Sequence, residues 1–519
     1  MKRNTLTTAV LAGLTGMAGM VSVASAVNVN PEGLGQVLLY PYYTARGGND
    51  TVISIVNTTE RGKAVKIRFI EALNSREVLD FNIYMSPYDV WTGAVTAEGD
   101  GGKLVTSDST CYVPNFGGEQ PFLRFGYAGD GGPQGLERTA SGYIEVIEMG
   151  TMVAQPGSQP GGADPAIIPW SAKHVNGVPR DCARLEAEWT DGSGLFWLDG
   201  GDSTFGFDTQ QGASGGLFGS ANIINVAEGT LLSYNATAID GFWAAGDMNH
   251  SEPDSVLPDL SNGTNSESFV FDNGVLEQHT WSEPLLALNS ALTLDRLMNE
   301  YVTQDGLNAQ TEWVLTLPTK RFHVDPEIGA ATANNPIPPF TRTWHINGDG
   351  SLNLPCEDME YSFWDREERE PSPQVGPPIV SPRPPQEETP QFQLCKEANV
   401  IRFSSGGEDL PAATEILKET ARDGQYARLG YTNFELPYDA GWVLFDLAQV
   451  PADSPTFGTY GPRRQSVAAN DGTVVEGLPV IGFQATTYTN GQLGGGSVLA
   501  NYGGAFNHRG SRSFVSSAP

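Results

Sequence analysis

The chain has 519 residues and a formal net charge of −31, from 30 basic and 61 acidic side chains. Such an excess of negative charge repels nucleic acid and anionic membrane surfaces, which excludes both as partners. The excess either attracts Ca²⁺ or keeps an exported protein soluble, and solubility is the simpler interpretation.

The first segment, residues 1–26, predicts a cleaved secretory signal. A basic start precedes an apolar stretch over 6–23, and the small residues at 24–26 suit a cleavage site. A membrane anchor is the alternative, but this stretch is rich in Gly, Thr and Ala and is weakly hydrophobic for a span. We therefore expect export to the periplasm, the cell surface or the medium, with no transmembrane segment in the mature chain.

Short bursts of β-forming residues alternate with turn residues along the chain, which contains 61 glycines and 35 prolines. This rhythm favours sandwiches of antiparallel sheets over helix bundles and wound α/β sheets. We predict a mainly β protein of immunoglobulin-like β-sandwich units, with a few short helices and long Gly/Pro-rich loops. The predicted units are a sandwich at 27–150, a loop-rich insertion at 151–218, a β-unit at 219–355, a Pro-rich loop at 356–395 and a C-terminal β-unit at 396–519.

Two segments of the first unit alternate as strands do. In 63–71 and 77–85 every second side chain is apolar, among them Phe69, Phe81 and Ile83. Alternation with a period of two predicts strands that turn one apolar face to a core. We therefore expect these three side chains to be buried.

A third segment, 52–56, is nearly all apolar. This predicts a strand covered on both faces, with 37–39 as its neighbour. The link at 57–62 has the Asn, Thr and Gly residues that are typical of a hairpin turn.

The clearest helix pattern lies at 283–303, where leucines at helical spacing form an apolar stripe. Shorter helices are predicted at 182–189 and near 410–422. The stretch 311–324 resumes the strand pattern and includes His323.

An even number of cysteines in an exported chain predicts two disulfides, for which three connectivities exist. We favour the two pairs of neighbours along the chain because they enclose the shorter loops. The second pair would clamp the Pro-rich segment 371–390 as a loop; a free linker between domains is the alternative. The favoured pairs are Cys111 with Cys182 and Cys356 with Cys395.

One motif raises the possibility of catalysis. The segment 212–216 matches the G-x-S-x-G pattern of serine hydrolases, with Ser214 as the nucleophile. A nucleophile elbow requires a strand before the motif and a helix after it, and the flanking residues suit neither. The six histidines have no close metal-ligand spacing, and no carboxylate pair for glycoside cleavage can be named. We therefore predict no catalytic residues and no enzyme activity.

Asp-Gly turns recur along the chain and could offer oxygen ligands to Ca²⁺ as a cofactor. None of them completes the spacing of an EF-hand, and Asp-Gly is also ordinary turn chemistry. The candidate ligands are Asp100, Asp130, Asp191, Asp199 and Asp349.

A group of aromatic residues near the N-terminus could form a stacking platform for sugar rings. Packing of the same side chains in a core or along its rim is the alternative, because neighbouring residues of a strand face opposite sides. The candidate platform consists of Tyr40, Tyr42, Tyr84, Tyr88 and Trp91.

The stretch LLYPYYTARGGNDTVISIVNTT, with FNIYMSPYDVW, NEYVT and TKRFHVD further on, resembles a group of exported Gram-negative bacterial proteins labelled only as cell-surface proteins. The resemblance implies export and a surface setting but brings no activity and no site residues. We predict a non-catalytic structural or adhesive protein of the cell surface. The alternatives are a carbohydrate- or Ca²⁺-dependent binding module, with surface glycans or other surface proteins as partners, and a secreted hydrolase.

Overall fold

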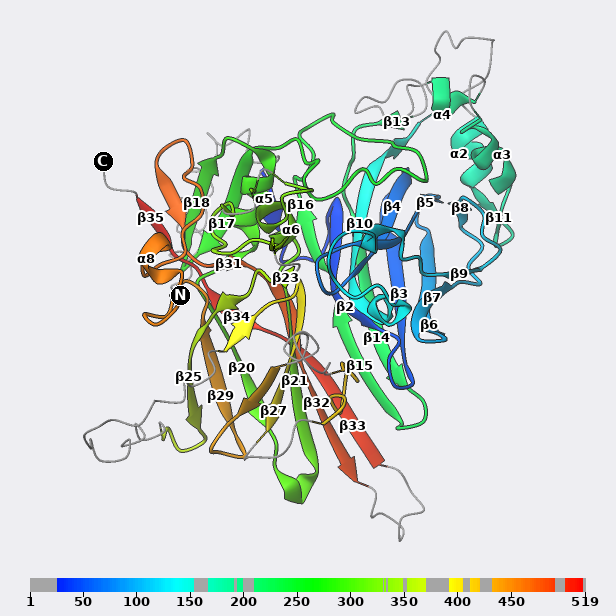
Figure 1. Cartoon of the computed structure of the whole chain (residues 1–519). Coiled ribbons are helices and arrows are strands. Elements are labelled where there is room, and N and C mark those ends of the chain that lie inside the picture. The colour runs from blue at the N-terminus through cyan, green and yellow to red at the C-terminus, as the bar shows by residue number, and fades with distance from the viewer. Residues whose placement is uncertain are drawn as a thin grey trace, which may run out of the picture.

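Antiparallel strands make up most of the regular structure, and the helices are few and short (Figure 1). The prediction of a mainly β protein is confirmed. The predicted signal up to residue 25 and the Pro-rich segment 371–390 lie outside the described residues. The computed structural model describes residues 26–153, 167–190, 194–198, 210–329, 331–332, 335–348, 352–369, 392–404, 411–420, 432–490 and 500–516.

An eight-stranded and a six-stranded sheet form the first sandwich and share one core. Phe69, Phe81 and Ile83 are buried in this core, as their alternation predicts. The larger sheet has the order β1 (Asn28–Val29), β16 (Thr237–Asp240), β2 (Val37–Thr44), β10 (Ser141–Met152), β4 (Gly62–Glu71), β5 (Glu77–Met85) and β8 (Cys111–Val113), with β13 (Gln210–Gln211) beside β10. The smaller sheet has the order β15 (Thr230–Asn235), β14 (Leu217–Asn225), β3 (Asn49–Asn57), β6 (Val90–Glu98), β7 (Gly101–Val105) and β9 (Glu119–Pro121).

The strands between residues 217 and 240 complete both of these sheets, because β14 pairs with β3 and β16 pairs with β2. The sheets therefore do not divide at residue 219, where composition suggests the start of a second unit. With eight and six strands they also exceed the seven to nine strands of an immunoglobulin domain. The immunoglobulin-like part of the prediction is therefore not confirmed.

The strand with both faces covered is β2 rather than β3. All eight residues of β2 are buried, whereas buried and half-buried residues alternate along β3. The neighbours of β3 are β14 and β6, so the predicted pairing of 52–56 with 37–39 is wrong. The link at 57–62 crosses between sheets instead of forming a hairpin, because β3 and β4 belong to different sheets.

The second sandwich consists of a four-stranded and a five-stranded sheet, seen at the lower left of Figure 1. Trp313 and Phe403 of the larger sheet and Phe445 of the smaller one pack in its core. The smaller sheet has the order β25 (Glu360–Asp365), β29 (Ala440–Asp446), β20 (Arg296–Val302) and β34 (Arg509–Ser511). The larger sheet has the order β28 (Thr432–Glu435), β27 (Ala398–Ser404), β21 (Ala309–Thr316), β32 (Ile481–Asn490) and β33 (Ala500–Asn507).

The helix predicted at 283–303 is wrong in its second half. Helix α5 (Pro284–Leu292) ends after nine residues, and the chain continues into strand β20. Leu297 and Tyr301 of β20 fill the core of the second sandwich, so tertiary packing overrides the helical spacing of the leucines. His323, expected in a strand, lies instead in the short helix α6 (Lys320–Val324).

Two further helix predictions have different outcomes. Helix α3 (Cys182–Ala187) confirms the helix predicted at 182–189. Asp181 caps its start, because its side chain accepts a hydrogen bond from the backbone N–H of Arg184. In the described part of 410–422, residues 411–420 form no helix, and Ala413 and Thr420 form an isolated bridge instead.

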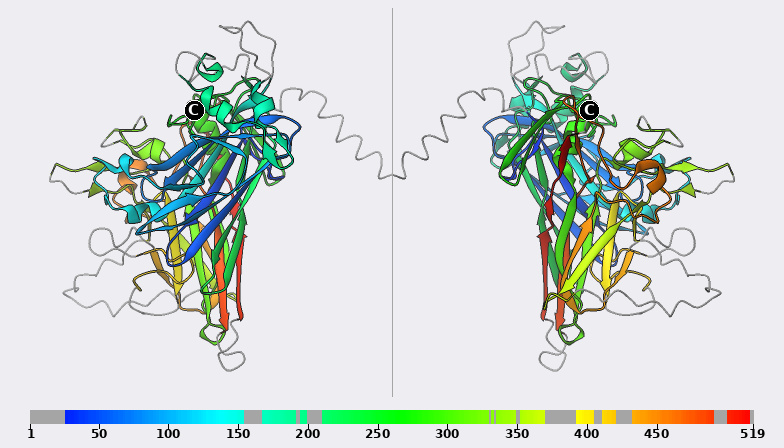
Figure 2. Two further views of the ribbon diagram at one scale, coloured as in Figure 1. Left: turned by 90° about the vertical axis from the view of Figure 1, so that its right-hand side faces the viewer. Right: turned by 90° about the vertical axis from the view of Figure 1, so that its left-hand side faces the viewer.

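The two sandwiches contact each other along β2, β15, β32 and β33 (Figures 1 and 2). The rings of Tyr234 on β15 and Phe483 on β32 stack with centroids 4.6 Å apart. Val314, Phe483 and Ala485 of the second sandwich belong to the same buried cluster as the core of the first. The two units therefore share apolar contacts rather than a solvated linker.

Helices cover parts of both units. The short helices α2 (Ile167–Ala172), α3 and α4 (Leu195–Leu198) lie beside the outer face of the eight-stranded sheet, where Leu185 packs near Tyr84.

Within the described ranges, no helix combines the length and apolar character needed to cross a membrane.

Candidate functional site

Both favoured disulfides are present in the structure. Cys111 joins β8 to Cys182 at the start of α3, and Cys356 joins Cys395. The second bridge connects the described residues on the two sides of the Pro-rich segment. Sequence neighbours are therefore paired, as predicted.

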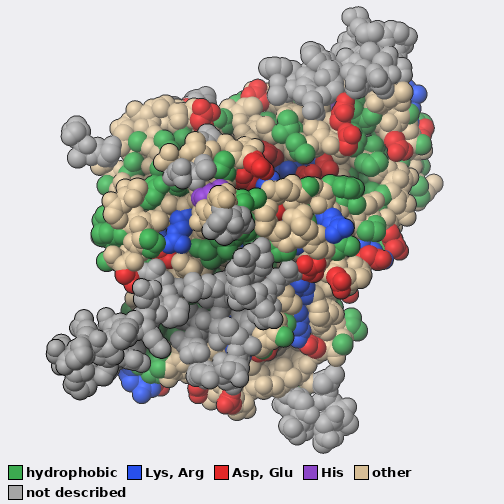
Figure 3. All heavy atoms as spheres, viewed as in Figure 1, with side chains coloured by type: hydrophobic (Ala, Val, Ile, Leu, Met, Phe, Trp, Pro, Cys, Tyr) green, Lys and Arg blue, Asp and Glu red, His purple; other side chains and the backbone are tan. Residues whose placement is uncertain are grey.

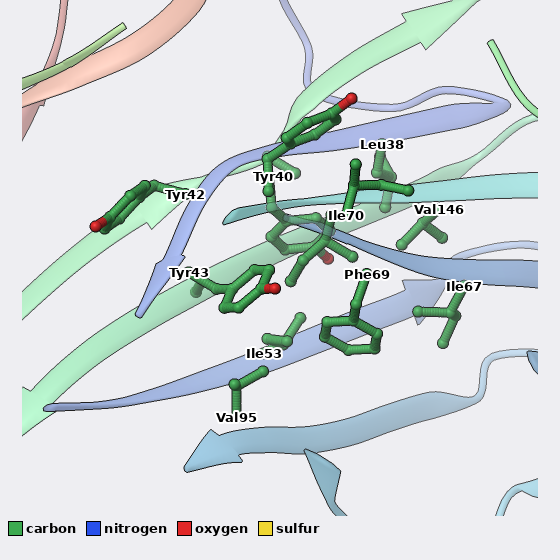
Figure 4. Packing of buried hydrophobic residues seen from close by; sticks show 14 of the residues in the cluster. Leu38, Tyr40, Tyr42, Tyr43, Ile53, Ile67, Phe69, Ile70, Val95 and Val146 are labelled. Carbon is green, nitrogen blue, oxygen red and sulfur yellow. The ribbon is translucent and has the colours of Figure 1, made fainter. Parts of the chain in front are cut away.

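The predicted aromatic platform does not lie at the surface. Tyr40, Tyr42, Tyr84 and Trp91 are fully buried, and only Tyr88 is exposed, at 68%. Figure 4 shows Tyr40 and Tyr42 on β2 close to the aliphatic core. Tyr40 and Tyr42 are buried because β2 is an interior strand and both faces of the sheet are covered there.

The hydroxyl groups of Tyr40 and Tyr42 form hydrogen bonds with other segments of the chain. The Tyr40 hydroxyl donates to the backbone carbonyl of Ser54 at 2.7 Å. The Tyr42 hydroxyl donates to the Glu419 carboxylate at 3.0 Å, across the contact between the sandwiches. Burial, followed by the negative charge of Glu419, raises the pKa of Tyr42 well above its ordinary value. These tyrosines therefore stabilise the fold and are not available to a ligand.

Ser214 is exposed, but its surroundings do not suit a nucleophile. Its hydroxyl lies 2.8 Å from the Lys63 ammonium group, which is paired with the Glu148 carboxylate at 2.7 Å. An ammonium group in such a pair donates protons and does not accept one. The motif lies between strands β13 and β14, and not between a strand and a helix.

The backbone around Ser214 is also occupied. The N–H groups of Ser214 and Gly215 both donate to Glu148, at 2.9 and 2.8 Å. Backbone donors of this kind form an oxyanion hole only when they are free to bind the reacting oxygen. In this arrangement they anchor the segment 212–216 to β10.

Two of the five candidate Ca²⁺ ligands lie in described residues. Asp100 is exposed in the turn between β6 and β7. Asp130 is buried and accepts hydrogen bonds from Arg138 at 2.7 Å and from Asn74 at 3.1 Å. Burial alone would raise the pKa of Asp130, but Arg138 outweighs that effect and lowers it. Asp130 is thus an ion-pair partner of Arg138.

Asp191, Asp199 and Asp349 lie outside the described residues. Within the part of the chain that is described, no three His, Cys, Asp or Glu side chains gather where they could hold a metal ion. Ca²⁺ binding stays a prediction.

A large hollow with exposed aromatic side chains lies on the second sandwich. We name it the β20–β33 groove; its volume is about 1000 Å³. Strand β20 forms one wall, Trp442 on β29 borders it, and β32 and β33 form the floor. Four aromatic side chains on its lining are between 36% and 65% exposed: Trp442, Tyr488, Tyr502 and Phe506.

The register of β32 and β33 explains the shape of the floor. Tyr488 lies opposite Tyr502, Thr486 opposite Gly504, and Gln484 opposite Phe506. These six positions share one face of the pair because side chains alternate along a strand. Gly504 has no side chain on this face, and the ring of Phe506 lies over it.

The wall along β20 carries hydrogen-bonding groups. β34 pairs with β20 only at Arg296, Leu297 and Met298, so the second half of β20 faces the groove. The Asn299 amide donates to the backbone carbonyl of Asn507 at 3.3 Å, which links the wall to the floor. Trp442 is fixed by stacking on Trp364, with ring centroids 4.2 Å apart.

A buried hydroxyl lies on the lining of the groove. Tyr301 is 2% exposed, and its hydroxyl has no hydrogen-bond partner among the described residues. Burial, followed by the nearby charge of Asp365, raises the pKa of Tyr301 well above its ordinary value. The hydroxyl is therefore a protonated donor at neutral pH, and an unpaired buried donor costs about 1–3 kcal/mol. An acceptor from a ligand would satisfy it.

Charges of both signs border the groove. Glu300, Asp365 and Glu368 contribute carboxylates, and Arg366 and Arg509 contribute guanidinium groups. The Asp365 carboxylate accepts backbone hydrogen bonds from Glu367 and Arg369, at 2.9 and 2.8 Å, so its position is fixed. The groove thus combines flat apolar faces with fixed polar groups.

A second hollow adjoins the first. We name it the β14–β15 trough; its volume is about 410 Å³. Outward-facing side chains of β14 and β15 line it, together with part of β33. The groove and the trough share the residues Phe506, Asn507 and Arg509.

Sequence patterns did not identify either hollow. Tyr502 and Phe506 stand four positions apart with Gly504 between them, and this spacing puts both rings on one face of a strand. That signal was available, but Trp442 and Tyr301 come from strands about 60 and 200 residues earlier. Only the sheet order brings them together.

A comparison of the chain with protein-family models, with curated proteins and with solved structures finds no match.

Proposed function

We propose that this protein is an exported, non-catalytic adhesive protein that binds glycans in the β20–β33 groove. The observation that carries the proposal is the set of four exposed aromatic side chains around this groove. Exposed aromatic rings bring a large desolvation gain to a ligand, and Trp and Tyr are enriched at binding interfaces. The predicted secretory signal and the two disulfides support export.

Sugars fit the chemistry of the groove better than other classes of ligand. A sugar ring has apolar faces that stack on Trp442 or Tyr502 and hydroxyl edges that bond to exposed polar groups of the lining such as Glu300 and Arg509. Nucleic acid bases also stack on aromatic rings, but the net charge of −31 repels their phosphates. The Tyr301 hydroxyl would donate to an oxygen of the bound sugar.

The non-catalytic part of the proposal rests on the contacts of Ser214. The Ser214 hydroxyl contacts the Lys63 ammonium group, which is paired with Glu148. The backbone N–H groups of Ser214 and Gly215 donate to the same Glu148 carboxylate. A panel of esterase, protease and glycosidase substrates tests this part, and turnover by the wild type but not by S214A would contradict it.

A glycan array that holds neutral, anionic, linear and branched glycans tests the binding proposal with the purified full chain. The variants are Trp442→Ala and Tyr502→Ala, with Phe271→Ala as the matched control. Phe271 is an aromatic side chain on β17 (Glu267–Asp272), 70% exposed and outside the groove. We expect the wild type and F271A to bind the same glycans.

We expect each groove variant to bind these glycans at least about tenfold more weakly, which corresponds to about 1.4 kcal/mol. Circular dichroism should give the same spectrum for all four proteins. The proposal fails if the wild type binds no glycan on the array, or if W442A and Y502A bind as well as F271A.

A further inference from the structure

The β14–β15 trough has a lining unlike that of the groove. Tyr234, one of its five residues from the first sandwich, is buried, and the other four are short and polar. These four stand in two cross-strand pairs, Ser220 with Asn235 and Asn222 with Ser233. The Ser233 hydroxyl donates to the Asn222 carboxamide oxygen at 2.5 Å. Hydroxyl and amide groups both donate and accept hydrogen bonds, so this ladder can pair with either type of group.

The charge of the trough is low compared with that of the whole chain. Among the described residues, Arg509 alone contributes a charge to its lining, whereas the chain carries a net charge of −31. Figure 3 shows acidic side chains spread over the visible face of the molecule. A polar lining with so few charges favours a neutral ligand that carries many hydroxyl groups.

Exposed side chains border both hollows. Phe506 is 61% exposed, and Asn507 and Arg509 are also exposed. A ligand that leaves the groove over these three residues enters the trough, because all three line both hollows. The trough lies where β15 of the first sandwich contacts β33 of the second, and the groove lies on the second sandwich.

We infer that the ligand is a neutral linear polysaccharide whose chain lies across both sandwiches, from the groove into the trough. This inference rests on the proposed function. The aromatic groove holds rings by stacking, and the trough holds further rings of the same chain by hydrogen bonds. Once one end of such a ligand is bound in the groove, binding of the other end in the trough is an intramolecular step. This raises the affinity of the whole ligand without contacts elsewhere.

The test measures how affinity depends on chain length. Oligomers of two and six rings of β-1,4-linked glucose, xylose, mannose and N-acetylglucosamine are titrated into the full chain by calorimetry. We expect the six-ring member of at least one series to bind at least about tenfold more tightly than its two-ring member. The inference is overturned if no series binds, or if the two lengths bind equally in every series that binds.

Variants locate the gain in affinity. The double variant replaces Asn222 and Ser233 by Ala. We expect it to bind the two-ring oligomer with the affinity of the wild type and the six-ring oligomer at least about fivefold more weakly than the wild type. The control is Thr96→Ala on β6, a polar residue of the same sheet outside the trough. Equal losses at both lengths, or no loss at six rings, would overturn the inference.

The two proposals fail in different ways. If the array detects only branched or terminal sugars and W442A abolishes that binding, the proposed function stands and the extended chain is wrong. If the array detects no glycan at all, both are wrong.

Discussion

The ammonium group of Lys63 on β4 lies 2.7 Å from a carboxylate oxygen of Glu148 on β10, and both side chains are completely buried. Glu148 also accepts the backbone N–H groups of Ser214 and Gly215. A buried ion pair survives only when further hydrogen bonds satisfy its remaining donors and acceptors. The G-x-S-x-G segment supplies these bonds and so has a structural role.

The first prediction concerns this pair. Glu148→Gln leaves the Lys63 ammonium group buried without a countercharge, which costs about 3–5 kcal/mol of unfolding free energy. Urea denaturation measures the loss. The control is Lys103→Ala, whose ion pairs with Glu98 and Glu119 are exposed to solvent, and it should cost far less than E148Q. Equal stability of E148Q and the wild type would contradict the prediction.

The second prediction concerns the disulfide between Cys111 and Cys182. The cysteines are 71 positions apart, and closing a loop of this length in the unfolded chain contributes about 4 kcal/mol of stability. We expect the double variant C111A/C182A to unfold at lower denaturant concentration than the wild type in oxidising buffer. In the presence of a reductant the difference between the two proteins should disappear; a difference that persists would mean that the loss comes from packing.

The sequence predicts strands well where one face of the strand meets a core. Phe69 and Phe81 alternate with polar residues and are buried as expected. The polar side of the same strands does not follow this rule. Lys66 and Arg68 are typical of a face in contact with water, yet both are buried. Asp80, Glu145 and other acidic partners neutralise their charges.

The origin of this difficulty is the distance between partners along the chain. Arg68 pairs with Glu145, 77 positions away, and Glu145 also binds Arg321, a further 176 positions away. Local periodicity contains no information about such partners. The cysteines are an exception, because loop length alone favours the pairing that the structure has.

The candidate site illustrates the same limit. Tyr40 and Tyr42 lie close together in sequence and are candidates for either a platform or the core, and the sheet order buries them in the core. Trp442 and Tyr502 lie in unremarkable strands and border the groove because β29 and β33 belong to facing sheets. Aromatic content is visible in a sequence, but exposure depends on the order of the strands and on what covers each face of the sheet.

The third prediction concerns acid unfolding and His250. Burial lowers the pKa of His250 to about 3, from an ordinary value near 6.5. The folded chain keeps this imidazole neutral while the unfolded chain binds a proton, so the contribution of His250 to stability falls as the pH falls from about 6.5 toward 3. We expect the loss to reach about 3 kcal/mol at pH 4.

The measurement is the urea midpoint of the wild type and of His250→Gln between pH 7 and pH 4. The variant should have the shallower pH dependence, whatever its stability at pH 7. Parallel curves for the wild type and H250Q would contradict the prediction.

The fourth prediction concerns Glu312, whose effect has the opposite sign. Burial raises the pKa of this carboxyl group to about 7, although it accepts hydrogen bonds from the backbone of Ile416 and Leu417. The folded chain holds this proton after the unfolded chain has lost it, so stability falls as the pH rises from about 4.5 to 7. Glu312→Gln should remove this fall, and the slope between pH 5 and pH 7 in urea denaturation tests it. A wild-type slope in E312Q would contradict it.

The last prediction concerns Gly504 in the floor of the groove. A Cβ atom at this position would lie 2.9 Å from the ring of Phe506, so a larger side chain displaces the ring from its place over Gly504 and changes the shape of the floor. Valine suits a strand, and the Phe506 ring is free to move because it is 61% exposed. We therefore expect Gly504→Val to keep the thermal stability of the wild type and to bind glycans at least about tenfold more weakly. Gly458 has no atom within 4 Å of an added Cβ and lies outside the groove, so G458A is the control. Unchanged glycan binding by G504V would mean that the ligand does not occupy the space between Tyr502 and Phe506.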